Sequence, residues 1–261
     1  MTEPELLVEV NGSVGTITLN RPAKRNAVTY AMWVALGDAC HRLAADPEVR
    51  VVVLRGAGDH FCAGADITEL LAPRPAGQPS FMDANMAAEH ALATLPKPVV
   101  AVVQGDCIGG GCALAIDCDL RLSADNARFG ITPAKLGIVY PPASLERAVR
   151  LLGPAAKRLL FTGDLVGAVE AHRIGLVDEL LSASQMDARL AELCDTLAQR
   201  SLLTQAATKE MVAAVLERGV VSVDLADSWA REVTVSGEMA EGVAAFEQRR
   251  PPQFPWRSAH S

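Results

Sequence analysis

The first half of the chain alternates between short β-branched runs and stretches with apolar residues at helical spacing. Two of the apolar runs flank Asn11-Gly12-Ser13, a sequence that is typical of a β-hairpin turn. Strands that alternate with helices predict βαβ units and a largely parallel sheet. The predicted strands are Leu6–Val10, Val14–Leu19, Val51–Leu54 and Val99–Val103, and the predicted helices are Ala31–Leu43 and Met82–Leu95.

After about residue 183 the pattern changes to helical spacing throughout. Two more short strands, Leu120–Leu122 and Leu176–Leu180, are expected before that point. The chain is therefore predicted to be an α/β protein with a core over residues 1–183 and a helical region over residues 184–261 of the same domain. The helices expected there are Ser184–Arg200, Leu202–Arg218 and Val223–Phe246, with Ser182, Ser201 and Ser222 as N-caps.

Composition and charge exclude several classes of protein. Half of the 261 residues are hydrophobic, which is enough for a large core. A net charge of -7 disfavours nucleic-acid binding. The longest apolar stretch is interrupted by Pro96, Lys97 and Pro98, so no membrane span is predicted. The acidic N-terminus does not resemble a signal peptide, and we expect a cytoplasmic protein.

The six cysteines show neither a CxxC pair nor the spacing of metal ligands. In a reducing compartment they are expected to be small buried hydrophobic residues, and no metal site is predicted. Cys62 and Cys112 lie in glycine-rich segments, where a reactive thiol is conceivable but is the less favoured interpretation.

Three glycine-containing segments carry the candidate chemistry. Phe61–Ile67 follows one predicted strand and precedes a short helix that Asp66 would cap. Gly105–Ala113 follows another strand and opens a helix, where backbone N–H groups are free at the positive end of the helix dipole. The third segment is Phe129–Tyr140. No GxGxxG motif follows the first strand, which disfavours a nucleotide-binding oxidoreductase.

In this order the segments resemble the crotonase superfamily, the enoyl-CoA hydratase/isomerase family, from about Leu6 to Arg250. The resemblance implies a crotonase (ClpP-like) fold of repeated ββα units with a helical C-terminal trimerisation region, and a homotrimer or dimer of trimers. The segments that carry the resemblance are Leu19–Ala27 (LNRPAKRNA), Phe61–Ile67, Ile108–Cys112, Thr162–Asp164 and Gly175–Val177 with Ala171.

The resemblance also implies an acyl-CoA substrate, with coenzyme A as part of the substrate and no tightly bound cofactor. The backbone amides of Ala65 and Gly110 are expected to form an oxyanion hole for a thioester enolate. Lys24 and Arg25 are expected to contact the CoA phosphates, whereas for Arg249 and Arg250 a phosphate contact and a solvated surface charge both stay open. The other residues expected to contact CoA are Ala27, Ala63, Asp66 and Ile67.

The chain departs from the family in its acid–base residues. Family hydratases carry two glutamates, which fall here on Ala113 and Pro133. Isomerases that keep the second glutamate have it at the position of Pro133, and an aspartate used by other members falls on Pro141. Because each proton-transfer group contributes about 10²- to 10⁴-fold in rate, efficient hydration by the standard route is expected to be lost.

The third segment is similar to that of methylmalonyl-CoA decarboxylases, which share Thr132-Pro133 and a tyrosine at the position of Tyr140. The match breaks at Ala65, where that subgroup has histidine, and at Val139, where it has proline. Loss of CO₂ leaves an enolate without any base, and needs only an oxyanion hole and an oriented, desolvated carboxylate. The leading hypothesis is an enzyme whose reaction passes through a thioester enolate, and decarboxylation of a malonyl-type acyl-CoA, oriented by Tyr140 and Thr132, best suits the missing glutamates.

Two alternatives stay open. A displaced acid or base would restore hydration or isomerisation, and a non-catalytic acyl-CoA binding protein would need neither. Tyr140 itself has an equally favoured structural interpretation, as a hydroxyl bonded to the backbone. The ionisable residues considered as displaced groups are Asp66, Glu69, Glu146, His90 and His60, of which His60 is expected on a loop surface.

Overall fold

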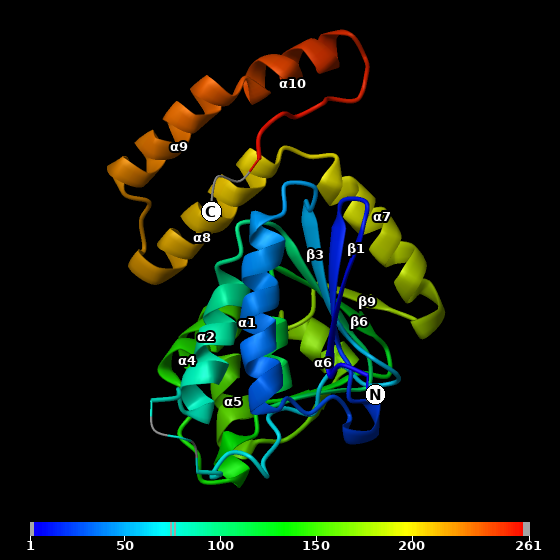
Figure 1. Cartoon of the computed structure of the whole chain (residues 1–261), viewed down its shortest axis with the longest axis vertical. Helices are drawn as coiled ribbons and strands as arrows, with labels where there is room; N and C mark the ends of the chain where they lie inside the picture. Colours follow the sequence, from blue (N-terminus) through cyan, green and yellow to red (C-terminus); the bar gives the residue numbers. More distant parts are fainter. Residues whose placement is uncertain (1–2, 74, 76, 258–261) are drawn as a thin grey trace.

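Over residues 3–73, 75 and 77–257, which the computed structural model describes, a six-stranded sheet runs in the order β1-β2-β3-β4-β6-β9 (Figure 1). The first two strands form the predicted antiparallel hairpin, and every other neighbouring pair is parallel. The predicted parallel sheet is confirmed. Its strands are β1 (Leu6–Asn11), β2 (Val14–Leu19), β3 (Val51–Gly56), β4 (Val99–Val103), β6 (Leu120–Ala124) and β9 (Glu179–Leu181).

The central strands are buried on both faces, which explains their uninterrupted β-branched sequences. Successive side chains of a strand point to opposite faces. Val52 and Leu54 of β3 therefore pack towards α1 (Tyr30–Ala45) and α2 (Phe81–Ala93). Val51 and Val53 pack with Met186 of α7 (Met186–Ala198), so α7 covers the other face of the sheet (Figure 1).

A second, smaller sheet was not predicted from the sequence. Its strands are β5 (Asp106–Ile108), β7 (Arg128–Gly130) and β8 (Val166–Gly167). Strand β5 leads directly into α3 (Gly110–Asp117), so this sheet fixes the start of that helix. The remaining elements of the core are α4 (Pro142–Leu152), α5 (Ala155–Thr162) and α6 (Ala168–Arg173), with short 3₁₀ turns at Pro22–Lys24, Pro133–Lys135 and Ala183–Gln185.

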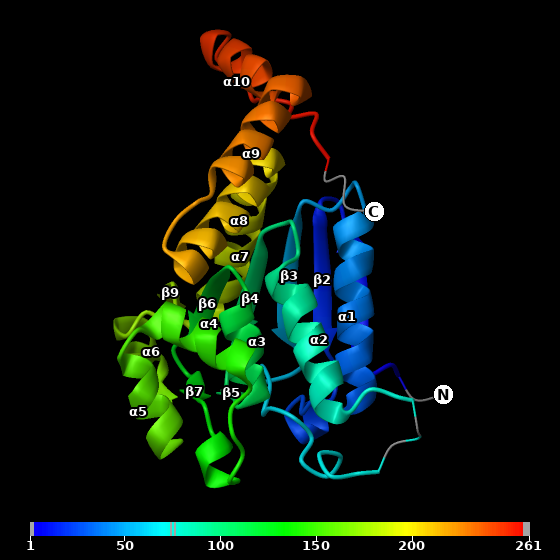
Figure 2. The same ribbon diagram turned by 90° about the vertical axis from the view of Figure 1, so that its left-hand side faces the viewer.

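The C-terminal helices project away from the sheet as an arm (Figures 1 and 2). The arm consists of α8 (Leu202–Arg218), α9 (Val223–Ser236) and α10 (Glu238–Glu247). The Ser201 and Ser222 side chains accept N-cap hydrogen bonds, as predicted. Many apolar side chains of the arm are exposed: Val212, Val215, Leu216, Val220, Val223, Val235, Met239, Val243 and Phe246.

Several predicted boundaries differ from the structure by one or two residues, and three differences have a local cause. The single helix expected over Val223–Phe246 is split at Gly237, which has a φ of +75° that ends α9. The helix expected from Ser184 begins as a 3₁₀ turn capped by Ser182. The strand expected at Leu176–Leu180 is instead Glu179–Leu181, because Leu176 donates its N–H to the Ala171 carbonyl after α6 and packs in the core.

No helix in the described part of the chain has both the length and the apolar composition that a membrane span requires.

A buried lysine donates hydrogen bonds to backbone carbonyls at the C-terminal end of α1. Lys97 is 1% exposed, and its Nζ donates to the carbonyls of Leu43 and Asp46 at 2.6 Å each. Lys97→Met removes the donor from both carbonyls, and we expect it to lower the free energy of unfolding by about 2–4 kcal/mol. Urea unfolding of Lys97→Met measures the change in the free energy of unfolding, with Lys157→Met at an exposed site as the control. A change no larger than that of the control would contradict the assignment.

Lys97 also predicts a pH dependence of stability. Burial lowers the pKa of Lys97 from 10.5 to about 8. Between these values the unfolded chain binds more protons than the folded chain, so the contribution of Lys97 to stability rises with pH. The stability difference between wild type and Lys97→Met should therefore be larger at about pH 9.5 than at about pH 7. Urea unfolding at both pH values checks the sign.

Candidate active site

The first two glycine segments lie side by side, held by backbone hydrogen bonds. The Cys62 N–H donates to the Asp106 carbonyl at 2.8 Å, and the Ile108 N–H donates to the Cys62 carbonyl at 2.9 Å. The approach is possible only without a side chain at Gly111, where a Cβ would lie 2.5 Å from the Cys62 oxygen. The small residues of both segments therefore allow two loops to pack backbone against backbone.

This packing brings two unused N–H donors together. The Val28 N–H donates to the Gly64 carbonyl, and the Asp66 N–H donates to the Val28 carbonyl. This bridge leaves the Ala65 N–H between them without an acceptor. Gly110 begins α3, so its N–H has no partner within the helix. Among the described residues neither group donates a hydrogen bond. A Cβ at Gly110 would lie 3.4 Å from the Ala65 nitrogen, so both amides border the same small space.

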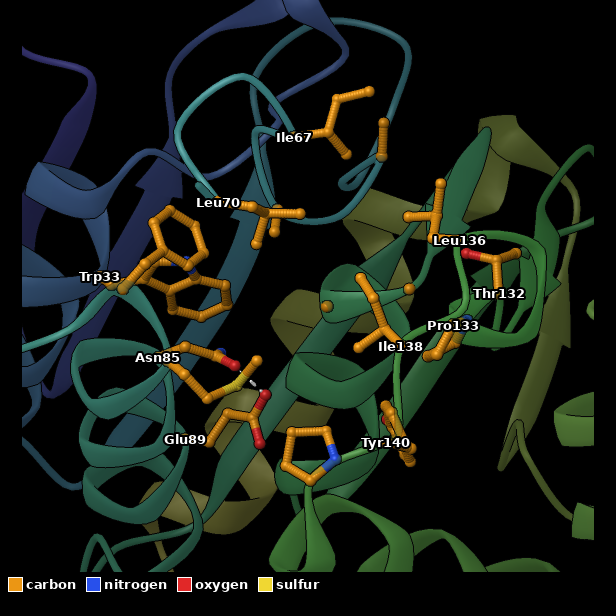
Figure 3. A pocket seen from close by; sticks show the side chains of 17 residues that line it. Trp33, Ile67, Leu70, Asn85, Glu89, Thr132, Pro133, Leu136, Ile138 and Tyr140 are labelled. Atoms are coloured by element: carbon orange, nitrogen blue, oxygen red, sulfur yellow. Dashed lines mark hydrogen bonds between the residues drawn. The ribbon is translucent and has the colours of Figure 1, made fainter. Parts of the chain in front are cut away.

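A cavity of about 120 Å³ adjoins the two amides (Figure 3). Of the predicted site residues, the structure places Ala63, Ala65, Ile67, Gly110, Thr132 and Tyr140 in its lining. Pro133 also lines it, whereas Ala113 is buried in α3. Most of the wall is apolar, with Trp33, Leu70, Phe81, Leu136 and Ile138. The arrangement suits an acyl chain whose carbonyl oxygen lies at the amides.

Tyr140 projects into this cavity with an unsatisfied hydroxyl. Its Oη is buried and has no hydrogen-bond partner among the described residues, so the bond to the backbone allowed for from the sequence is absent. Burial raises the pKa of the Tyr140 hydroxyl well above its usual value. The group is therefore a hydrogen-bond donor for a ligand and not a base. Thr132 lies near Gly109, where a Cβ would be 3.4 Å from its Oγ1.

The sequence reasoning missed Glu89, the one carboxylate among the described residues that line the cavity. Glu89 is on α2 and is 2% exposed. Its side chain points into the cavity beside Asn85 and across from Ile138 and Tyr140 (Figure 3). Asn85 and Glu89 are four residues apart on the buried face of α2, where the helical pattern would otherwise place apolar residues. Two polar residues on the predicted buried face of this helix are the sequence feature that could have identified Glu89.

Lys24, Arg25 and Ala27, which are also predicted to contact CoA, do not line the cavity. Lys24 ends the first 3₁₀ turn and is exposed. Arg25 is 60% exposed, and its Nη1 donates to the buried Asp106 carboxylate at 3.0 Å. The Ala27 carbonyl accepts from Arg21 at 2.7 Å. At the other end of the chain, Arg250 pairs with Glu241 on the arm.

Asp66 does not cap a helix, contrary to the prediction. Residues 67–71 form turns, and the Asp66 carboxylate accepts from the Thr68 N–H and hydroxyl while Arg21 pairs with its other oxygen. The hydrogen bond from Thr68 is the main reason that the pKa of Asp66 is lowered. The Asp66 carboxylate is thus held in the loop by Thr68 and Arg21, and it does not line the cavity.

The other ionisable candidates also lie outside the cavity lining. His90 is exposed, and Glu146 pairs with Arg150 at the surface. Glu69 accepts from the Tyr30 N–H at 2.8 Å, near the start of α1. His60 is 31% exposed, less than a loop surface implies, because its Nδ1 accepts from the Asp106 N–H at 3.0 Å.

All six cysteines are free and buried, which confirms the expectation that they are core residues. Cys62 lies beneath the two amides, with its Sγ 3.2 Å from the Asn26 carbonyl oxygen. Burial raises the pKa of the Cys62 thiol to about 12, so it is not a thiolate nucleophile at neutral pH. No cluster of His, Cys, Asp or Glu in the described residues is arranged to hold a metal ion.

Comparisons with known proteins show the family to which the chain is similar. A family model described as enoyl-CoA hydratase/isomerase matches residues 9–257. A putative enoyl-CoA hydratase of Thermus thermophilus is 37% identical over 93% of this chain and 98% of its own length. A crotonyl-CoA hydratase of Syntrophomonas wolfei is 30% identical over 97% and 99%. The crystal structure of an enoyl-CoA hydratase/isomerase family member is 38% identical, covers 97% of both chains and has a TM-score of 0.89.

Proposed function

Since this chain belongs to the enoyl-CoA hydratase/isomerase family and has the crotonase fold, we propose that its cavity binds the acyl part of an acyl-CoA thioester, with the thioester oxygen between the Ala65 and Gly110 amides. The observation that carries the proposal is the pair of unused N–H groups beside an apolar cavity. Removing a proton from the carbon next to a thioester, or losing CO₂ from it, places negative charge on that oxygen. Two fixed donors in a dry site stabilise the charge, each by about 2.7–4 kcal/mol.

For the reaction itself we favour proton transfer, as in hydratases and isomerases. Glu89 supports this choice because a carboxylate is available in the cavity although residues 113 and 133 are Ala and Pro. The same carboxylate disfavours decarboxylation, since a malonyl-type substrate would place a second negative charge near it. Decarboxylation is the second candidate, supported by the unpartnered Tyr140 hydroxyl, which would orient a substrate carboxylate.

The nucleotide end of CoA is proposed to lie on the side of Lys24 and Arg25. Both side chains are exposed next to the segment that carries Ala63 and Ala65, and the Ala63 N–H donates to the Arg25 carbonyl at 2.8 Å. Arg25 shares its charge with Asp106, so Lys24 is the more available partner for a phosphate. We further propose that the apolar arm packs against other copies of the chain, in a trimer or a dimer of trimers.

The test offers the purified chain a mixture of crotonyl-, 3-enoyl-, malonyl- and methylmalonyl-CoA in deuterated water and follows every species by mass spectrometry. We expect proton transfer, seen as addition of water, as a shifted double bond or as deuterium on the acyl chain. Loss of CO₂ would favour the second candidate. If the chain binds CoA thioesters but changes none of them, the proposal of an enzyme would be rejected in favour of a non-catalytic acyl-CoA binding protein.

A further inference from the structure

The polar groups around Glu89 hold its carboxylate at the edge of the cavity. We propose that Glu89 is the acid–base residue of the reaction, and that it carries one proton along the acyl chain of a 3-enoyl-CoA to give the 2-enoyl-CoA. This inference rests on the proposed function, because it requires an acyl-CoA thioester in the cavity.

Three donors fix the position of the Glu89 carboxylate. Asn85 Nδ2 donates to Oε1 at 2.9 Å. Ser144 Oγ donates to Oε2, and Arg147 Nη2 donates to the same oxygen at 3.1 Å. A carboxylate has about four lone-pair positions, so both on Oε2 are used and one on Oε1 is left. The cavity that Glu89 lines is where a substrate proton would reach it.

Arg147 connects Glu89 to a second buried carboxylate. Its Nε forms a close ion pair with Asp117, and its side chain is 19% exposed. Burial raises the pKa of Asp117 well above its usual range, and the nearby Glu89 charge adds to the rise. Arg147 therefore lies between two buried carboxylates, pairing through Nε with Asp117 and through Nη2 with Glu89. Pairing with an arginine compensates for part of the cost of burying a carboxylate away from water.

The other polar side chains of the cavity do not accept a proton from carbon at neutral pH. Asn85 is an amide and Thr132 a hydroxyl. The raised pKa of the Tyr140 hydroxyl makes it a donor. Within the described lining, Glu89 is left as the single base.

Glu89 alone can carry the proton through the whole proposed reaction. The C2–H bond of the 3-enoyl-CoA breaks, its proton moves to Glu89, and its electron pair forms the enolate held by the Ala65 and Gly110 amides. The enolate then collapses, the double bond moves from C3–C4 to C2–C3, and Glu89 returns the proton to C4. No water or cofactor is consumed, and the enzyme ends as it began.

The cavity favours this shift over hydration. A bound water needs about two to four polar partners, whereas a proton shift along a carbon chain needs one carboxylate and an apolar wall. Across from Glu89, the wall includes Pro133 and Ile138, and Pro141 also lines the cavity. None of these side chains can hold a water or supply a second proton.

The test compares Glu89→Gln, Glu89→Asp and the surface control Glu146→Gln with the wild type. Each full-length protein is given 3-hexenoyl-CoA, and the conjugated 2-enoyl thioester is followed by absorbance and mass. Crotonyl-CoA is supplied in parallel to detect addition of water, and its binding is measured by calorimetry. Glutamine retains the shape of Glu89 and can still accept from Ser144, so folding is checked by melting temperature. Glu89→Asp decides the question where Glu89→Gln does not fold.

We expect the wild type and Glu146→Gln to isomerise 3-hexenoyl-CoA, and Glu89→Gln to be at least about 10²-fold slower with unchanged binding. Glu89→Asp should fall between them. A Glu89→Gln rate within about threefold of wild type overturns the role of Glu89, as does a Glu89→Asp rate equal to wild type. Hydration of crotonyl-CoA without isomerisation by the wild type overturns the proton shift. A wild type that neither binds nor changes any thioester contradicts the proposed function itself.

Discussion

Gly110→Ala should reduce turnover of acyl-CoA by about 10²- to 10³-fold or more and leave the fold intact. The added methyl would lie 3.4 Å from the Ala65 nitrogen and 3.4 Å from the Trp33 ring, which are ordinary contact distances. The protein therefore tolerates the methyl, but the methyl occupies the space in which the thioester oxygen would meet both amides. Steady-state rates with the best substrate of the mixture measure the loss.

The matched control for this prediction is Gly37→Ala. Gly37 lies in α1, and the nearest atom to an added Cβ is the Ala88 Cα at 3.9 Å. We expect its activity to equal that of the wild type, with a slightly higher melting temperature because alanine favours helix. A melting temperature of Gly110→Ala close to that of the wild type, with a loss of rate that Gly37→Ala does not show, would support the oxyanion hole. Wild-type rates in Gly110→Ala would show that the two amides do not bind the reacting oxygen.

Asn26→Ala should lower the free energy of unfolding by about 3–5 kcal/mol. Asn26 is fully buried, and its Nδ2 donates to the carbonyls of Ala57 and His60 at 2.9 and 2.6 Å. Its Oδ1 accepts from the Arg21 N–H at 2.9 Å. Truncation leaves three partly buried backbone groups without this partner, and an unpaired buried group costs about 1–3 kcal/mol. Urea unfolding followed by circular dichroism gives the value.

A second variant distinguishes the contribution of the Asn26 hydrogen bonds to stability from the contribution of its backbone conformation. Asn26 has a φ of +57°, in the left-handed region that glycine adopts freely. Asn26→Gly loses the same three bonds but relieves this strain, so it should be about 1 kcal/mol more stable than Asn26→Ala. The opposite order would mean that the side-chain volume of residue 26 matters more than its backbone. Equal stability of Asn26→Ala and wild type would contradict the assigned role altogether.

The main sheet was predictable because its strands are continuous β-branched runs between helices of regular period. Val99–Val103 was placed with its observed limits, and the N-caps Ser201 and Ser222 marked two helix starts. The smaller sheet was not predictable, since its strands span two or three residues and owe their conformation to the glycine segments that they support. Likewise, nothing local distinguishes Gly237 as a break from a tolerated helical glycine.

For the site, the resemblance to a family located the residues whose backbone matters, and the structure puts Ala65 and Gly110 together. Their roles are predictions that the proposed experiments test. Glu89 was not predicted because the family's own carboxylate positions lie in other segments, at Ala113 and Pro133. A reading of the helical face alone would have placed Asn85 and Glu89 among buried residues, where unpaired polar groups are costly. Their partners Ser144 and Arg147 come from a distant helix, α4, and no sequence pattern predicts that contact.

The buried thiols of the two glycine segments can report how often these segments separate. Cys62, Cys107 and Cys112 are each fully shielded from solvent, and burial raises the pKa of the first two. An alkylating reagent can reach them only when the two glycine segments separate, because the reactive species is an exposed thiolate. The rate at which these cysteines are labelled therefore measures how often the loops that hold Ala65 and Gly110 come apart, independently of any substrate.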